Sequence, residues 1–219
     1  MKALKLPLGY VTTTLTLGAM ACAFIAKPAS AAILSDLIPG GTLTADGITF
    51  SNFSYTASAL GGAIRIPSSA VTVNPFGSGL QFVLPLFAGP GQVADAAITY
   101  TATSSKLLTS LTLSFASAVT GTGQASVGEL LTSDGSAVTN SVNTPGTPIS
   151  TVALFTPSNV VNATKDIIVS GGNGLSTVSV VDQNFTTAVP EPSEVTGMLA
   201  LAGILGTSFI QKRNQRKMG

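Results

Sequence analysis

The sequence of 219 residues contains no histidine, no tryptophan and one cysteine, and only 9% of its residues are charged. Without histidine, Ser-His-Asp and Cys-His catalytic arrangements and histidine-ligated metal sites are excluded. The net charge of +1 offers no basic surface for nucleic acid. A low charge content with 23 glycines and 12 prolines also disfavours a helical cytosolic enzyme, because exposed helix faces normally carry Lys, Glu and Arg.

The N-terminal residues 1–31 have the pattern of a secretory signal peptide. Two lysines lie in the first five residues, and residues 6–26 are uncharged and mostly apolar. Small side chains at Ala29 and Ala31 predict cleavage by signal peptidase before Ala32. An uncleaved membrane anchor is the alternative, because the apolar stretch is long enough to cross a bilayer.

The single cysteine, Cys22, lies inside this predicted signal peptide. A lipoprotein signal would place a polar mature sequence after the cysteine, whereas the apolar residues 24–26 follow it here. We therefore expect Cys22 to be removed and the mature protein to contain no disulfide. An exported domain of this size can dispense with disulfides because its core is large enough to hold it together.

The C-terminal residues 189–219 combine three features in a fixed order. A proline-flanked glutamate lies in residues 189–193, and an apolar run follows over residues 195–210. The run is slightly shorter than the ~20 residues that span a bilayer comfortably. The tail, residues 211–219, is basic. Four cations should hold it on the cytoplasmic side of a membrane: Lys212, Arg213, Arg216 and Lys217.

This order closely resembles the PEP-CTERM sorting signal of Gram-negative and cyanobacterial exported proteins. The resemblance implies that a membrane protease, exosortase, cuts near the motif and passes the protein to the cell surface or the medium after transient anchoring. It also implies an association with exopolysaccharide and biofilm. The recognition element would be Pro190, Glu191, Pro192 and Ser193.

The physical chemistry of the motif suits such a tag. The two prolines prevent helix formation and sheet pairing, so the motif stays extended and accessible to a protease. Glu191 places a lone negative charge at the membrane surface. The alternative is a simple C-terminal anchor whose helix is capped by Ser193 or Glu194. Both interpretations place the body outside the inner membrane.

The body, residues 32–188, carries seven acidic and three basic side chains, and more than a quarter of its residues are Ser or Thr. Hydroxyl groups, rather than charged groups, must therefore interact with water at its surface. Serine and threonine suit the exposed faces of β-strands. Apolar and polar residues alternate over 98–102, 111–115 and 177–180, and the alternation over 48–55 changes phase after Phe50. Such alternation predicts strands, and the phase change predicts a bulge or bend.

These patterns predict an all-β fold: an antiparallel β-sandwich or jelly-roll-like body between an N-terminal signal helix and a C-terminal transmembrane helix. Turn signals include Asp46-Gly47 and Asp134-Gly135. We expect a short helical turn near 92–97 and a long loop over 136–147. Further strands are predicted at 63–66, 69–73, 79–84, 124–132, 148–155 and 166–170.

Parts of the body, around residues 47–53, 95–100 and 121–125, are similar to a set of cyanobacterial PEP-CTERM proteins. No particular activity follows from that similarity, which supports the class and the export route only. We predict a non-enzymatic surface or matrix protein without catalytic residues, metal or cofactor. Its partners would be signal peptidase, exosortase, the membrane and exopolysaccharide, and not nucleic acid.

A secreted carbohydrate- or calcium-binding module is the alternative. Sugar platforms favour Trp and Tyr, but the body offers two tyrosines, Tyr55 and Tyr100, in core-like alternations, and its eight Phe are expected in the core. Calcium could bind at Asp46, Asp134 or Asp182, because acidic loops supply oxygen ligands. Asp46 and Asp134 precede glycine, however, as turn formers do. Two carboxylates, or Lys106 with a preceding serine, could form a catalytic pair, but none of these residues lies in a recognisable motif.

Overall fold

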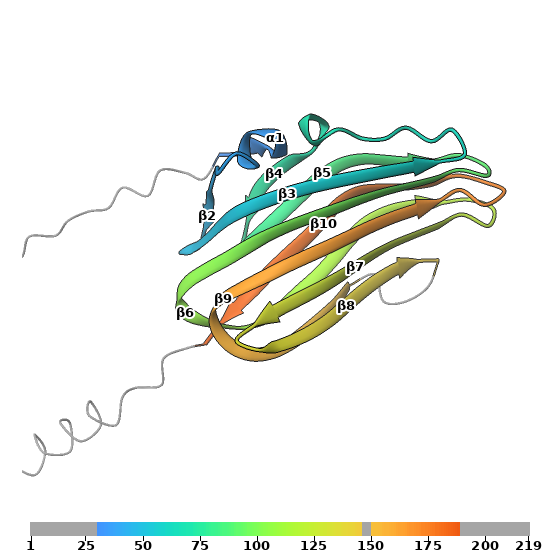
Figure 1. Ribbon diagram of the computed structural model, residues 1–219. Coiled ribbons are helices and arrows are strands. Elements are labelled where there is room, and N and C mark those ends of the chain that lie inside the picture. Colours follow the sequence, from blue (N-terminus) through green and yellow to red (C-terminus); the bar gives the residue numbers. More distant parts are fainter. Residues whose placement is uncertain (1–29, 146–149, 189–219) are drawn as a thin grey trace, which may run out of the picture.

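The computed structural model describes residues 30–145 and 150–188, and these form one antiparallel sheet folded into two layers (Figure 1). This confirms the all-β, antiparallel prediction. The strands are β1 (Ala32–Ile33), β2 (Leu43–Ala45), β3 (Ile48–Leu60), β4 (Thr72–Phe76), β5 (Gly79–Ala88), β6 (Val93–Val119), β7 (Gln124–Ser133), β8 (Ser136–Thr144), β9 (Ser150–Ser170) and β10 (Ser176–Thr187). A short helix, α1 (Leu34–Leu37), and a 3-10 turn, η1 (Ser68–Ala70), complete the described elements.

The two longest strands, β6 and β9, belong to both layers. The first part of β6 pairs with β3 and with the second part of β9, which continues through β7 to the edge strand β8. We call this the front layer. The second part of β6 pairs with β10 and with the first part of β9, and β10 continues through β5 and β4 to β1. This is the back layer. The layers are therefore two parts of one continuous sheet.

The sheet folds over between Thr103 and Leu108 of β6, where the register with β9 shifts. The backbone N–H of Lys106 donates to Ser104 Oγ at 3.1 Å, and Asn159 Nδ2 donates to the Ser104 carbonyl at 2.9 Å. These side chains satisfy backbone groups that lose their ladder partners at the bend. They also give Ser104 a structural role at the bend.

The predicted turns and bulge are confirmed. Asp46 and Asp134 have φ of 45° and 39°, and each is followed by a glycine with positive φ. Two consecutive residues with positive φ match the twist of a two-residue hairpin. The Asp46 pair connects β2 to β3, and the Asp134 pair connects β7 to β8. The phase change after Phe50 is a bulge: the register of β3 shifts between Ser51 and Ser54, and Asn52 has φ of 56°.

Three local predictions are wrong, and a fourth is wrong in part. Most of the predicted loop 136–147 is strand β8, the predicted helical turn near 92–97 is the start of β6, and the predicted strand 63–66 is irregular. The predicted strand 69–73 begins in the 3-10 turn η1, and β4 starts only at Thr72. Strand β8 pairs with β7 along its whole length, so its polar sequence suits an edge strand whose outer face meets water. Tertiary pairing outweighs weak local propensity there.

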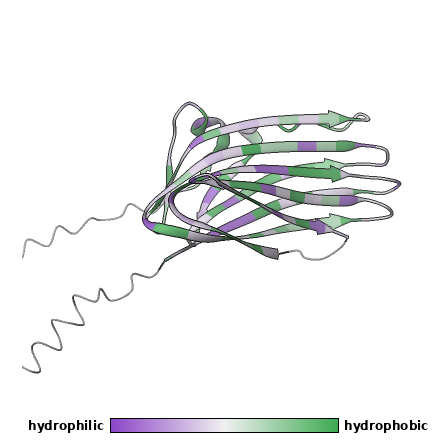
Figure 2. Cartoon of the chain, turned by 60° about the horizontal axis from the view of Figure 1, so that its bottom comes forward, coloured by the Kyte–Doolittle hydropathy of each residue, from purple (hydrophilic) through white to green (hydrophobic). Residues whose placement is uncertain are grey.

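The core lies between the two layers, where alternate residues of the long strands meet. Figure 2 shows apolar and polar segments alternating along these strands. An aromatic cluster of Phe50, Phe53, Phe82, Tyr100 and Phe185 crosses the interior with ring centroids 5.8–6.1 Å apart. Of the eight body phenylalanines expected in the core, six are buried, and Phe76 and Phe87 are 44% and 43% exposed.

The predicted terminal segments fall largely outside the described residues. The signal helix, Ala29, the sorting motif, the apolar run and the basic tail all lie there. Ala31 is exposed, and Ala32 is the first residue of β1, so the predicted cleavage would leave β1 intact. Within 30–145 and 150–188, no helix is long and apolar enough to span a bilayer.

Candidate functional site

A buried ion pair lies on the inner face of the front layer. Glu129 of β7 and Lys165 of β9 are directly opposite each other in the ladder. Lys165 Nζ donates to Glu129 Oε1 at 3.3 Å, and both side chains have no exposed area. The ammonium also lies 5.9 Å from the centroid of the Phe82 ring in the back layer, within cation–π range.

The ion pair continues into a hydrogen-bonded chain between the layers. Glu129 Oε1 also accepts from Gln183 Nε2 of β10, and Tyr100 Oη of β6 donates to Gln183 Oε1 at 2.7 Å. Gln183 is fully buried and Tyr100 is 1% exposed. Three strands of the front layer and one of the back layer therefore meet at one polar chain inside an apolar core.

Burial dominates the electrostatics of this chain. Desolvation raises the pKa of Glu129, although Lys165 and Gln183 act in the opposite direction. Desolvation lowers the pKa of Lys165 against the attraction of Glu129. The two pKa values are thus drawn toward each other, and the neutral pair of a carboxylic acid and an amine becomes accessible.

Two buried polar atoms at this site, Glu129 Oε2 and Asn140 Nδ2, have no hydrogen-bond partner among the described residues. Asn140 of β8 is directly opposite Glu129 in the ladder and is 8% exposed. Buried polar groups in native proteins are almost always paired, so these two atoms mark the place where a partner or a reaction is expected.

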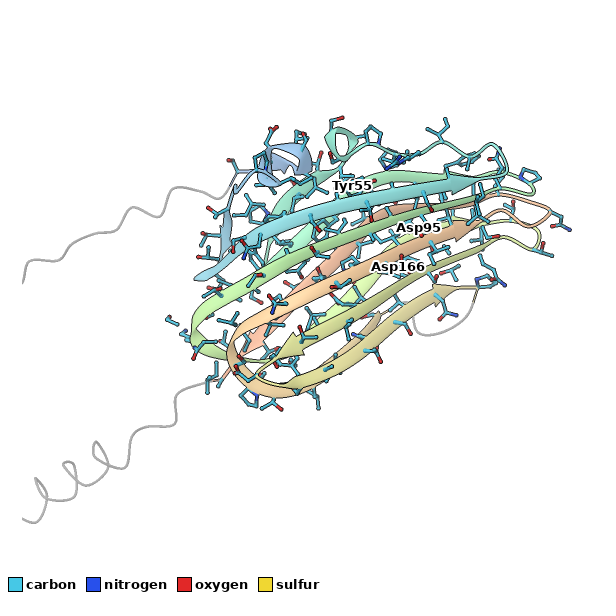
Figure 3. The ribbon with its side chains drawn as sticks, in the orientation of Figure 1. Tyr55, Asp95 and Asp166 are labelled. Atoms are coloured by element: carbon cyan, nitrogen blue, oxygen red, sulfur yellow. The ribbon has the colours of Figure 1, made fainter. Side chains whose placement is uncertain are left out.

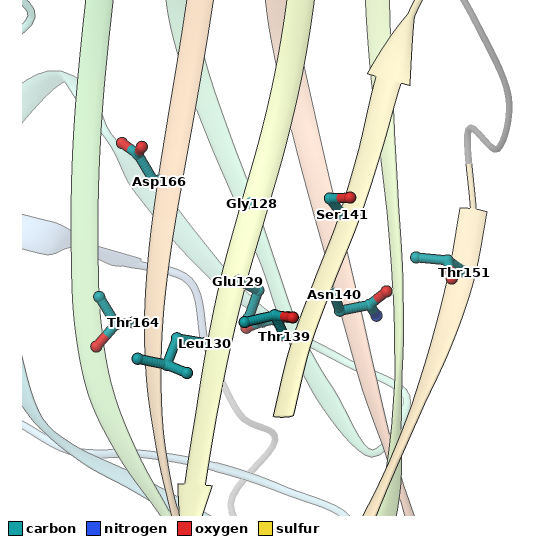
Figure 4. A pocket seen from close by; sticks show the side chains of 9 residues that line it. All are labelled: Gly128, Glu129, Leu130, Thr139, Asn140, Ser141, Thr151, Thr164 and Asp166. Carbon is teal, nitrogen blue, oxygen red and sulfur yellow. The ribbon is translucent and has the colours of Figure 1, made fainter. Parts of the chain in front are cut away.

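A groove of about 600 Å³ adjoins this polar chain (Figure 4). Its lining comes from β7, β8 and both parts of β9: Gly128, Glu129, Leu130, Thr139, Asn140, Ser141, Thr151, Thr164 and Asp166. A Cβ at Gly128 would have no neighbour within 4 Å, so the absent side chain leaves open space there. Besides the buried Glu129 and Asn140, the groove offers hydroxyls, the Asp166 carboxylate and the apolar side chain of Leu130 to a ligand.

Asp95 of β6 and Asp166 of β9 lie on the outer face of the front layer (Figure 3). Burial, the negative charge of Asp166 and a hydrogen bond between the two carboxyls raise the pKa of Asp95 to about 6. Asp95 is opposite Ile168 and Asp166 is opposite Ala97 in the ladder, so the two carboxyl groups lie diagonally across β6 and β9 on the same face.

The other candidate residues have structural roles. Asp46 and Asp134 form hairpin turns, and Asp182 accepts a hydrogen bond from Gln81 at 3.0 Å. The Tyr55 hydroxyl donates to the Ile66 carbonyl at 2.7 Å. Across 30–145 and 150–188, no three His, Cys, Asp or Glu side chains gather as metal ligands. The four sorting-motif residues lie outside these ranges.

Sequence reasoning missed the buried polar chain, although the sequence contained a signal for it. Glu129 lies in phase with Ala125, Val127 and Leu131, and Lys165 lies in phase with four apolar neighbours. A charged residue in the apolar phase of a strand predicts a buried charge, and two of opposite sign predict a pair.

No family model and no curated protein matches the chain. Among solved structures, it is similar to "TmCBM61 in complex with beta-1,4-galactotriose", with 9% identity over 61% of this chain and 88% of that one, at a TM-score of 0.34. It is also similar to the "Bacteriophage CBA120 tailspike protein 4 enzymatically active domain", with 21% identity over 60% of this chain and a TM-score of 0.31. The match spans 19% of the tailspike chain. These identities and TM-scores are too low to assign a function to this chain.

Proposed function

We propose that this protein is an exported, non-enzymatic surface or matrix protein whose C-terminal segment is sorted by an exosortase. One observation carries the proposal: residues 189–219 combine a Pro-Glu-Pro motif, an apolar run and a basic tail, at the opposite end of the sequence from a signal peptide pattern. Such a chain crosses the inner membrane, stays anchored until it is processed, and then reaches the cell surface or the medium.

The body has properties that suit this role. Its exposed strand faces are rich in serine and threonine and poor in charge, so hydroxyl groups face the solvent and any surrounding polymer. The two ends of the described chain, near Ser30 and Ala188, lie at the same end of the body (Figure 1). A body held through its C-terminal segment would therefore present its far end, made of glycine-containing turns, away from the attachment point.

The sorting role is tested in the native host with a Pro190→Ala/Glu191→Ala/Pro192→Ala variant. We expect the variant to remain uncut and membrane-bound, whereas a matched Gln211→Ala variant, altered in the same segment outside the motif, should be processed normally. Processing and surface release of the triple variant at the normal rate would contradict the proposal.

The groove supports a second candidate function, the binding of a saccharide. Its hydroxyls and the Asp166 carboxylate can exchange hydrogen bonds with sugar hydroxyls, and Leu130, which is 39% exposed, offers an apolar contact. Protein purified from the host should bind the host's exopolysaccharide saturably. Asp166→Ala should weaken binding about tenfold, the equivalent of losing one hydrogen bond to a charged group. Asp182→Ala, on the other layer, should not.

The same titration with and without calcium tests the calcium-binding alternative. A calcium-dependent module would lose binding when calcium is chelated, whereas the groove as described needs only hydrogen bonds and apolar contact. No saturable binding under either condition would eliminate this second function and leave the sorting proposal untouched.

A further inference from the structure

Three inward-facing side chains on neighbouring strands form a set that the proposed function does not use. Lys165 of β9 and Asn140 of β8 flank Glu129 of β7, and each is directly opposite it in the ladder. The exposed fractions are 0%, 8% and 3%. An amine, a carboxamide and a carboxyl group therefore lie on three neighbouring strands, each of them more than nine-tenths buried.

We propose that Lys165 and Asn140 form an intramolecular amide cross-link between β9 and β8, with Glu129 transferring the protons. The Lys165 Nζ lone pair attacks Asn140 Cγ, and a new C–N bond forms. The bond between Cγ and Nδ2 then breaks, and Nδ2 leaves as ammonia. One amine and one primary amide become one secondary amide and one ammonia, so atoms and electrons balance without any oxidant or co-reactant.

The reach of the side chains permits the reaction. Two strand spacings of about 4.8 Å each separate the Cα atoms of Lys165 and Asn140, a distance that an extended lysine and an asparagine side chain together span. Figure 4 shows the Asn140 side chain directed toward Thr151 of β9. A change between staggered rotamers about its Cα–Cβ bond turns the carboxamide toward Glu129.

The surroundings supply the chemistry. A lysine desolvated in an apolar pocket is a better nucleophile because more of it is the free amine, and burial lowers the pKa of Lys165. Burial also raises the pKa of Glu129, so this group can carry a proton to the leaving nitrogen. Holding the reacting groups in one folded interior replaces an encounter between molecules.

The cross-link also accounts for both unpartnered atoms. Asn140 Nδ2 is the atom that leaves, and the new amide N–H becomes a donor for Glu129 Oε2. The covalent tie would hold the edge strand β8 to β9 across β7. An exported body without cysteine would gain from it what other secreted domains gain from a disulfide.

The mature protein, purified from its host, denatured and digested after aromatic residues, provides the test. Phe155 lies between Asn140 and Lys165 in the sequence, so unlinked peptides separate. We expect the two peptides to remain joined, with a mass lower than their sum by one ammonia and fragment ions that locate the branch at Lys165. Two separate, unmodified peptides would overturn the proposal.

Variants distinguish the cross-link from other ammonia losses. Asn140→Ser and Lys165→Met should abolish the joined peptide, and the matched control Asn143→Ser, on the exposed face of β8, should retain it. Glu129→Gln should slow its formation at least about a hundredfold, the usual contribution of a proton-transfer group. Ammonia loss that persists in Lys165→Met would indicate cyclisation of asparagine on its own backbone and would contradict the proposal. Each outcome is independent of exosortase sorting.

Discussion

The two faces of the front layer hold their charges in opposite ways. On the inner face, Glu129 and Lys165 have opposite signs and buried side chains and are hydrogen-bonded to each other, and Glu129 also accepts a hydrogen bond from Gln183. On the outer face, Asp95 and Asp166 have the same sign and contact water. Burial raises the pKa of an acid on both faces, yet the inner pair is compensated and the outer pair is not. The consequences of removing one member should therefore differ in size and in sign.

The largest expected effect comes from breaking the inner pair. In an Asn140→Ser background, where the proposed cross-link cannot form, Lys165→Met leaves Glu129 buried without its cation, which should lower the free energy of unfolding by about 3–5 kcal/mol. The double variant Lys165→Met/Glu129→Leu removes both charges and should recover most of that loss. Urea unfolding of the single and double variants measures both values. Equal losses in the two would show that the pair contributes through packing rather than charge.

A smaller effect is expected further along the same chain. Tyr100→Phe removes the donor to Gln183 Oε1 and leaves a buried acceptor unpaired, at a cost of about 1–3 kcal/mol. The aromatic contacts of the ring remain. Tyr55→Phe is a suitable comparison because its hydroxyl donates to a carbonyl in a half-buried setting, so its loss should be smaller. Equal losses would indicate that the buried chain adds nothing beyond an ordinary hydrogen bond.

The smallest effect, and one of opposite sign, is expected on the outer face. The pKa of Asp95 rises from 3.8 to about 6 on folding, so the folded state binds this proton more tightly than the unfolded state. The contribution of this carboxyl group to stability is then greatest below pH 4 and is lost as the pH rises through about 6. Asp95→Asn should stabilise the protein above that pH by less than about 1 kcal/mol, because the site is partly exposed.

Unfolding experiments at pH 4 and pH 7.5 check this sign. The gain from Asp95→Asn should be present at the higher pH and absent at the lower one, and Asp166→Asn should give the same pattern. A gain that is equal at both values would mean that the substitution acts through packing and not through the like-charge contact.

The sequence predicted the fold class because the signals for it are local. Alternation over 111–115 and the two Asp-Gly turns act within a few residues, and the structure confirms them. Strand β8 has weak alternation, and its existence depends on a neighbour brought close by the Asp134 turn. The continuous two-layer sheet depends on the bend in β6, where the register with β9 changes, and no short pattern specifies that bend.

The candidate site was only partly predictable, for a related reason. The phase of Glu129 and Lys165 along their strands indicates that each is buried, but their pairing follows from a register between strands 36 positions apart in the sequence. Gln183 comes from the other layer, so its contact with Glu129 requires the complete fold. The sorting motif is the reverse case, because its whole pattern is contiguous in residues 189–219.

The most direct test of the central claim, that this chain is exported and sorted, is the mass of the protein isolated from its native host, with both ends of the chain sequenced. The account predicts a mature chain that begins at Ala32, ends near residues 189–193, and is recovered from the cell surface or the medium. Recovery of the untrimmed 219-residue chain from the cytosol would contradict it.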